Sequence, residues 1–192
     1  MIDNTHAFHL VGGRLCLDFL NTADWAPSGD AIVENLTHEE DLMAWCRRVG
    51  LHDIQETANL SGMEDLQDFR SALRRVFLKT MEKVQPDRHD LAMLNSHLGF
   101  ASLSAPLVLS ERGLRFSRAV SVQQAIALSA AAVLTDGHEI GRLKSCPADD
   151  CGWLFLDESR NRRRKWCSME ICGNRAKARR HYHRHAGPPA KA

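Results

Sequence analysis

The chain has 192 residues, 44% of them apolar, which suffices for one ordinary domain and a small satellite. No apolar run approaches the roughly 20 residues that span a bilayer, and the first residues lack the pattern of a signal peptide; we expect a cytoplasmic protein with reduced thiols and no membrane partner. The net charge of +1 conceals two unlike segments, since residues 146–192 carry eleven Lys/Arg against five Asp/Glu and residues 1–145 carry fourteen against nineteen. A balance of +6 beside one of −5 is a hint of nucleic-acid binding.

The first 50 residues contain one short apolar stretch that could be a strand or a helix, and one helix with clear start and stop signals. The apolar stretch at residues 15–22 is too short for its periodicity to separate a strand from a buried helical turn. Thr37 and Glu40 have the spacing of a capping box, in which each side chain satisfies a free backbone N–H at a helix start. We predict that the helix after them stops at Gly50.

Two further helices and a hairpin are predicted in the middle of the chain. Residues 66–81 repeat apolar side chains at helical spacing. Four basic residues within this helix are expected to lie mostly away from the apolar stripe: Arg70, Arg74, Arg75 and Lys79. Residues 91–98 predict a helix that ends near Gly99, and residues 106–109 and 114–116 flank a polar turn in the pattern of a hairpin.

The last helix of this region is predicted to be the most deeply buried. Ser121 and Gln124 form a second capping-box pattern. Residues 125–134 follow and are apolar all round, which is typical of a central helix. We therefore expect a mainly α protein with a short β-hairpin, and a mainly helical domain over residues 1–140.

Four cysteines with the spacing C-x4-C-x15-C-x4-C follow this domain. They are Cys146, Cys151, Cys167 and Cys172. Two close pairs separated by a mid-length insert can bring four thiolates around one ion, and structural Zn²⁺ prefers such a closed tetrahedron. The alternatives are an iron–sulfur cluster and four metal-free core cysteines. His181, His183 and His185 are interpreted as exposed helix or tail residues, and Cys16 and Cys46 as core residues.

The surroundings of the cysteines predict a small finger at residues 141–186, followed by a flexible tail at 187–192. Gly152 can take the positive φ of a tight metal knuckle, and the alternation at residues 153–157 suits a short strand. Asn174 is a candidate cap for a helix that begins at the last cysteine, as in treble-clef-like zinc folds. So small a unit needs its metal, which can contribute on the order of 10 kcal/mol of folding free energy.

Ten Lys/Arg and one acid lie between residues 159 and 185. The predicted DNA contacts are Arg160, Arg162, Arg163, Arg164, Lys165, Arg175, Lys177, Arg179, Arg180 and Arg184. Because the insert and the final helix project from one metal centre, these cations have a fixed spacing and can contact phosphates or read guanine edges. The alternatives are a solvated surface or a contact with an acidic protein, including this chain's own N-terminal domain.

The residues Cys-Gly-Asn-Arg at 172–175 resemble the signature of the CGNR zinc-finger family, and the resemblance extends over residues 142–184. Residues 17–22, Leu-Asp-Phe-Leu-Asn-Thr, are similar to the marker of the ABATE domain that accompanies this finger. The resemblance implies a bacterial, stress-responsive transcription regulator whose finger binds DNA and whose N-terminal domain senses a small molecule. Within the marker, three polar residues either line a ligand pocket or brace the domain through side-chain-to-backbone hydrogen bonds. They are Asp18, Asn21 and Thr22.

Three functions compete. The first is a DNA-binding regulator, with a homodimer expected because regulators commonly match two-fold operators. The second is a zinc-dependent interaction module that docks an acidic protein without contacting DNA. An enzyme is the weakest interpretation, because the sequence has no Walker loop, dinucleotide fingerprint, H-E-x-x-H motif or nucleophile elbow, and a closed site of four thiolates leaves zinc no position for water.

Overall fold

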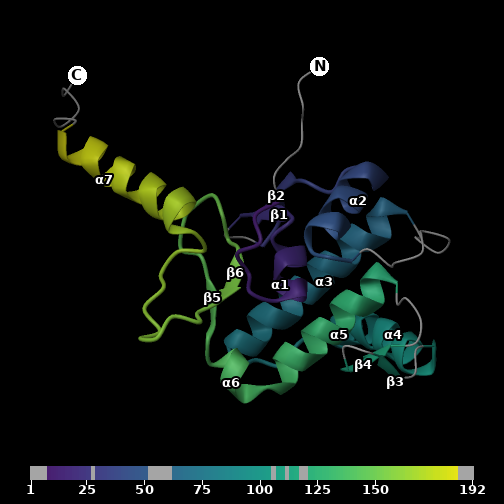
Figure 1. Ribbon diagram of the computed structural model, residues 1–192. Helices are drawn as coiled ribbons and strands as arrows, with labels where there is room; N and C mark the ends of the chain where they lie inside the picture. The colour runs from purple at the N-terminus through teal and green to yellow at the C-terminus, as the bar shows by residue number, and fades with distance from the viewer. Residues whose placement is uncertain are drawn as a thin grey trace.

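The computed structural model describes residues 8–26, 29–51, 62–104, 107–110, 113–116 and 121–185. The N-terminal part contains α1 (Leu15–Leu20), β1 (Ala23–Trp25), β2 (Ala31–Glu34), α2 (Glu39–Arg48), α3 (Met63–Met81), α4 (Arg88–Ser104), β3 (Leu107–Ser110), β4 (Gly113–Phe116), α5 (Val122–Thr135) and α6 (Gly137–Ile140). The C-terminal part contains β5 (Leu143–Ser145), β6 (Leu154–Leu156), the π-helical turn η1 (Met169–Gly173) and α7 (Asn174–His185). The mainly α fold is confirmed, and α7 projects away from the helical body (Figure 1). The predicted tail lies outside the described residues.

Helix α5 is the centre of the helical body, as its apolar sequence predicts. It contacts α1, α3 and α4, and Ile126, Ala127 and Ala130 have no exposed surface. Its capping box is confirmed, since Ser121 Oγ accepts a hydrogen bond from Gln124 N (3.2 Å) and Gln124 Oε1 accepts one from Ser121 N (2.9 Å). No helix in the described part of the chain is long and apolar enough to cross a membrane.

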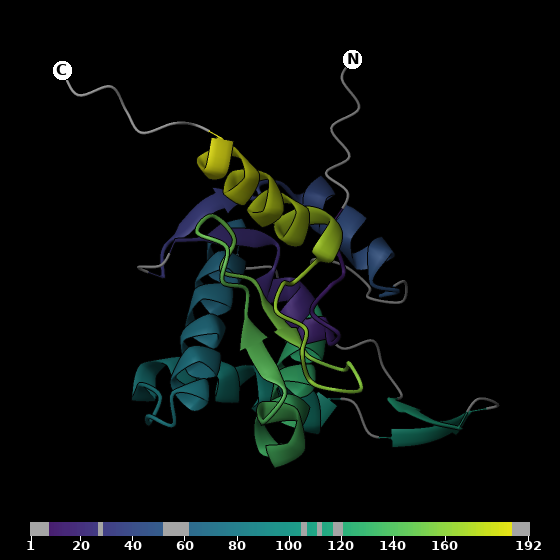
Figure 2. The same cartoon turned by 90° about the vertical axis from the view of Figure 1, so that its left-hand side faces the viewer.

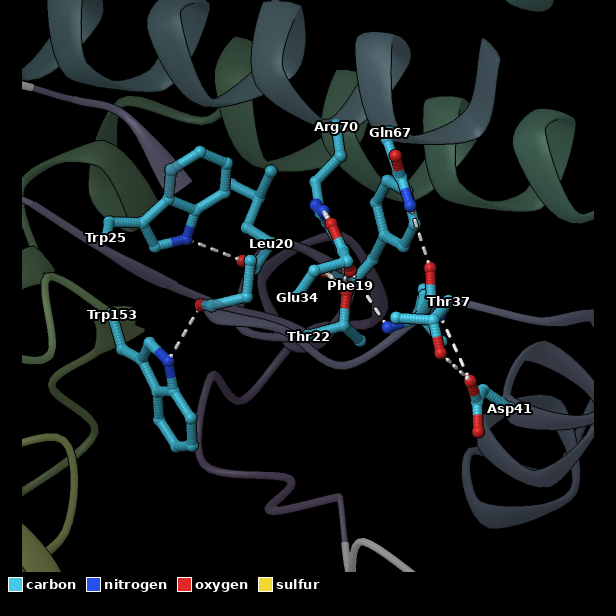
Figure 3. A network of polar contacts seen from close by, with 12 residues as sticks. Phe19, Leu20, Thr22, Trp25, Glu34, Thr37, Asp41, Gln67, Arg70 and Trp153 are labelled. Carbon is cyan, nitrogen blue, oxygen red and sulfur yellow. Dashed lines mark hydrogen bonds and ion pairs between the residues drawn. The ribbon is translucent and has the colours of Figure 1, made fainter. Parts of the chain in front are cut away.

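Several helix ends differ from the predicted ones. Helix α2 begins one residue later than predicted, because Asp41 and not Glu40 accepts the free N–H of His38 (3.0 Å) and also bonds the Thr37 hydroxyl (2.7 Å; Figure 3). Its stop at Gly50 is confirmed by a left-handed φ of 81°. Helix α4 passes the predicted end at Gly99 and runs to Ser104, since a glycine weakens a helix without ending it.

The stretch whose type was open, residues 15–22, folds as helix α1 followed by a turn into β1. Each described sheet is a two-stranded antiparallel pair: β1 with β2, β3 with β4 in the predicted hairpin, and β5 with β6. Leu143, Leu154 and Leu156 of β5 and β6 belong to the same buried cluster as α1, α3 and α5. The finger strands are therefore packed into the core of the helical domain.

Helix α3 departs from its predicted amphipathic form, because two arginines expected to avoid the apolar side are buried. Arg70 is 1% exposed and Arg74 is 4% exposed. Arg70 pairs with Glu34 of β2 and donates to the Thr22 hydroxyl at 2.7 Å (Figure 3). Arg74 lies over the Trp25 ring, 4.5 Å from its centroid. Strand β1 and its partner β2 thus supply polar and aromatic partners that the spacing of α3 alone does not reveal.

Candidate metal centre and basic surface

The four predicted cysteines meet at one point. All four are buried, and one sulfur from each lies within 4.8 Å of the others. The Cys151–Cys167 and Cys167–Cys172 sulfur distances are both 3.5 Å. All six cysteines of the chain are free, so the four form a candidate metal site and not two disulfides. Cys16 and Cys46 lie in the core, as predicted.

The four sulfurs lie close enough to shift one another's pKa. Hydrogen bonds from Cys151 and Cys167 lower the pKa of the Cys146 thiol, and the same bonds raise the pKa of the two donors. Arg175 also donates from Nη2 to Cys172 Sγ (3.2 Å). A positive donor at a ligand sulfur is typical of the outer shell that orients metal ligands.

The backbone delivers the cysteines in two pieces. Cys146 and Cys151 lie in the turn between β5 and β6, residues 146–152, which we call the metal knuckle. Cys146 N closes this turn by donating to Trp153 O (2.8 Å). Gly152 in this turn has φ 61°, and a Cβ there would lie 2.9 Å from Trp25 Cβ and Trp25 O. Cys172 lies in η1, whose first turn is capped by Ser168 and not by the predicted Asn174. A hairpin followed by a helix that starts at the last cysteine is the order expected of a small zinc finger.

The helical domain binds the metal knuckle through hydrogen bonds along β1. Trp25 N donates to Cys151 O (3.1 Å), and Trp153 Nε1 donates to Ala23 O (3.0 Å; Figure 3). Asn21 bonds Leu154 twice, through Nδ2 to the carbonyl (2.9 Å) and through Oδ1 from the N–H (3.0 Å). We call these contacts the clasp. Trp25, Trp153 and the four cysteines also share one buried cluster.

The insert between the cysteine pairs is held in place by hydrogen bonds to Lys144 and to the buried Asp157. Lys144 Nζ binds Asp157 Oδ2 (2.5 Å) and the carbonyls of Arg162 and Arg164. Burial alone would raise the pKa of Asp157, but hydrogen bonds from Lys144 and Ser159 outweigh it and hold that pKa well below its usual range. The insert is therefore an ordered loop with a defined position over β6.

Arg164, a predicted DNA contact, is a structural residue of this loop. Its guanidinium donates to the carbonyls of Val11, Leu156, Trp166 and Cys167. It also lies 4.3 Å from the centroid of the Phe155 ring. A guanidinium with these contacts is not available to a phosphate, so the geometry removes Arg164 from the set of candidate DNA contacts.

The other predicted cations lie on the insert and on α7, and they divide into two groups. Figure 2 shows the backbone of these two segments, with the yellow-green insert leading into the first turn of the yellow helix α7. Exposed side chains with no ion-pair partner among the described residues belong to Arg160, Arg162, Arg163, Lys165, Lys177 and Arg180. A groove of about 250 Å³ between the knuckle and α7 brings Lys165, Trp166 and Arg180 together. Arg184 follows on the last turn of α7. The second group, Arg175 and Arg179, is paired with acids of the knuckle.

The sequence matches two family models. Residues 13–137 match ABATE, described as "Putative stress-induced transcription regulator". The chain belongs to the ABATE family. Residues 142–185 match the CGNR zinc finger, so the cysteine cluster, the insert and α7 all lie within that finger. A comparison with curated proteins finds no match.

The three polar residues of the ABATE marker are engaged inside the molecule. Asp18 Oδ1 accepts the Gly12 N–H (2.8 Å), Asn21 belongs to the clasp, and Thr22 Oγ1 donates to Phe19 O (2.7 Å). Burial raises the pKa of Asp18 to about 6, against the opposing effects of the Gly12 N–H and the Arg164 charge. Asn21 also lines a cavity of about 280 Å³ beside Cys151 and Arg175.

Three residues of the site are not among those that the sequence predicts for it. The acids Asp149 and Asp150 face α7 and bind its arginines; their place beside Cys151, opposite a basic helix, is the signal that could have shown them. Arg74 lies against the knuckle, with a terminal nitrogen 3.2 Å from the position of a Cβ on Gly152. The helical spacing could have shown Arg74, because it lies three residues before Phe77 at the border of the apolar stripe, whereas Arg75, whose side chain is 55% exposed, lies on the opposite side of α3.

Proposed function

We propose that this ABATE protein is a transcription regulator that binds DNA through a zinc-shaped CGNR finger. The observation that carries the proposal is the position of the cysteine cluster at the base of α7, where one centre fixes both the insert and the helix that hold the exposed cations. Fixed cations on a helix and a neighbouring loop are suited to contact phosphates and to hold a helix in a groove.

Zinc fits the donors. A tetrahedron with Zn–S bonds of about 2.3 Å has sulfurs about 3.8 Å apart, close to the 3.5 Å of two of the observed pairs. Four thiolates leave no open position, which is typical of a structural site. Bound zinc would cross-link the β5–β6 turn to η1 and stabilise the folded finger.

The residues proposed to meet DNA are those with exposed cations outside ion pairs. They are Arg160, Arg162, Arg163, Lys165, Lys177 and Arg180, with Arg184 added from its place on α7. Lys165 Nζ lies 5.1 Å from the centroid of the Trp166 ring, so the groove at this point offers both charge and an aromatic wall. Such a surface is expected to bind any duplex weakly and its own site more tightly.

A salt series tests the proposal. Fluorescence anisotropy of the zinc-loaded protein with duplexes from its own promoter region and of random sequence gives log K against log [salt]. We expect the triple variant Lys165→Gln/Lys177→Gln/Arg180→Gln to flatten the slope by about 2–3, since each phosphate contact contributes about 0.9. The control Arg47→Gln/Arg48→Gln/Arg88→Gln removes the same charge from exposed positions of the ABATE domain and leaves the slope unchanged.

Absence of salt-sensitive binding to any of these duplexes would refute the proposal. The second candidate, docking of an acidic protein, is favoured by one observation, the pairing of Arg175 and Arg179 with carboxylates. It predicts that Arg175→Glu/Arg179→Glu loses a co-purifying protein while DNA binding is unaffected. The small-molecule effector of the ABATE domain and the homodimer stay predictions.

A further inference from the structure

Two adjacent acids of the metal knuckle hold two arginines of the proposed DNA-binding helix. Arg179 Nη1 binds Asp149 Oδ2 at 2.8 Å, and Arg179 Nη2 lies 3.1 Å from both carboxylate oxygens of Asp150. Arg175 Nη1 binds Asp150 Oδ2 at 3.0 Å while its other arm reaches Cys172 Sγ. We call this arrangement the acidic clamp.

The clamp uses the geometry that an arginine uses for a phosphate. A guanidinium presents parallel N–H groups that match carboxylate and phosphate oxygens alike. Arg179 therefore has its forked face occupied by carboxylates in the free protein. The positions on α7 explain the division, because Arg175 and Arg179 are four residues apart and share the face toward the knuckle, whereas Lys177 and Arg180 are exposed.

The clamp can open. The side chains of Arg175 and Arg179 are 39% and 41% exposed, and those of Asp150 and Asp149 are 46% and 85% exposed. Ion pairs this exposed contribute little to stability and are screened by salt. Neither acid is a ligand of the cysteine cluster or a member of a buried core cluster, so the fold does not depend on them in the way that it depends on Asp157.

We propose that Asp149 and Asp150 act as an intramolecular substitute for DNA phosphates and so determine the specificity of the finger. This inference rests on the proposed function. In complexes with DNA of any sequence, the two acids stay paired with Arg175 and Arg179 and repel the phosphates of the nearby DNA backbone. Binding then relies on the exposed cations. At a matching site, additional contacts compensate for opening the clamp, and the two arginines join the interface.

A double-mutant cycle on a generic duplex tests the clamp. Asp149→Asn/Asp150→Asn is expected to tighten binding about three- to tenfold and to steepen the salt slope by about 1–2, as released arginines reach phosphates. The gain must depend on the released side chain, so Arg179→Gln should cost at least about threefold more affinity in the Asn background than in the wild type. Equal zinc content of all variants shows that the knuckle is intact.

Glu170→Gln is the control for a simple loss of negative charge, because it removes one exposed carboxylate from the same finger outside the clamp. It should change generic affinity by much less. An unchanged or weaker affinity of the Asn variant, or no coupling to Arg179, overturns the clamp while leaving DNA binding itself in place. Failure of every variant and of the wild type to bind any duplex overturns the proposed function and the clamp together.

Discussion

Asn21 should be among the most important polar residues for stability, because it alone supplies both hydrogen bonds of the clasp to Leu154. Asn21 is 4% exposed and Leu154 has no exposed surface. Asn21→Ala leaves the Leu154 N–H and carbonyl without the partners that now lie 3.0 and 2.9 Å away. An unpaired buried polar group costs about 1–3 kcal/mol, and two groups lose their partner, so we expect the free energy of unfolding to fall by about 2–6 kcal/mol.

Urea unfolding of the zinc-loaded protein, followed by circular dichroism, measures this loss. Asn161→Ala makes the same change at an exposed position of the insert and should stay within about 0.5 kcal/mol of the wild type. Because the clasp holds the strand next to the metal knuckle, Asn21→Ala should also release zinc to a chelator more readily. An unfolding free energy equal to that of the Asn161→Ala control would show that the clasp does not join the finger to the helical domain.

Three more predictions concern the same region. Gly152→Ala should lose about 2–4 kcal/mol of unfolding free energy and much of its zinc, since the left-handed φ and the contact with Trp25 both oppose a Cβ; zinc retention at the wild-type level would contradict this. Arg70→Met should cost about 2–4 kcal/mol in urea unfolding because it leaves Glu34 without its partner, whereas Arg74→Met should cost less than about 1 kcal/mol because Arg74 Nε and Nη1 have no partner to lose. Burial raises the pKa of Asp18 to about 6, so its carboxyl takes up a proton more readily in the folded state than in the unfolded state. The stability of the wild type relative to Asp18→Asn should therefore increase by about 2–3 kcal/mol as the pH falls from 7 to 4. Parallel plots of unfolding free energy against pH for the two proteins would contradict the raised pKa.

Local patterns predicted most of the fold. Apolar periodicity and the Ser121 capping box located α5, and the cysteine spacing located the metal site, because both depend on residues close in sequence. The end of α4 and the cap of α2 were misplaced by a few residues, since competing side chains such as Asp41 decide such ends. The type of residues 15–22 depended on packing against α5, which no local pattern contains.

The fate of each cation could not be predicted in the same way. Three of the cations, Arg163, Arg164 and Lys165, are neighbours in sequence. The side chain of Arg164 points inward and donates to the carbonyls of Val11 and Cys167, whereas the other two side chains are exposed. Arg175 and Arg179 pair with Asp150 because the cysteine cluster brings α7 next to the metal knuckle, a contact between segments about 25 residues apart in sequence. A basic segment therefore predicts a cationic surface, and the folded geometry decides which cations belong to it.

The most direct test of the zinc-shaped finger compares DNA binding with and without metal. Anisotropy at one salt concentration measures the affinity of the zinc-loaded protein, the chelator-stripped protein and the stripped protein after zinc is restored, each with a duplex from its own promoter region. Removal of zinc is expected to weaken binding at least about tenfold, since α7 and the insert lose their common anchor, and restored zinc is expected to recover the affinity. Equal affinity of the loaded and stripped protein would contradict the claim that the metal positions the DNA-binding cations.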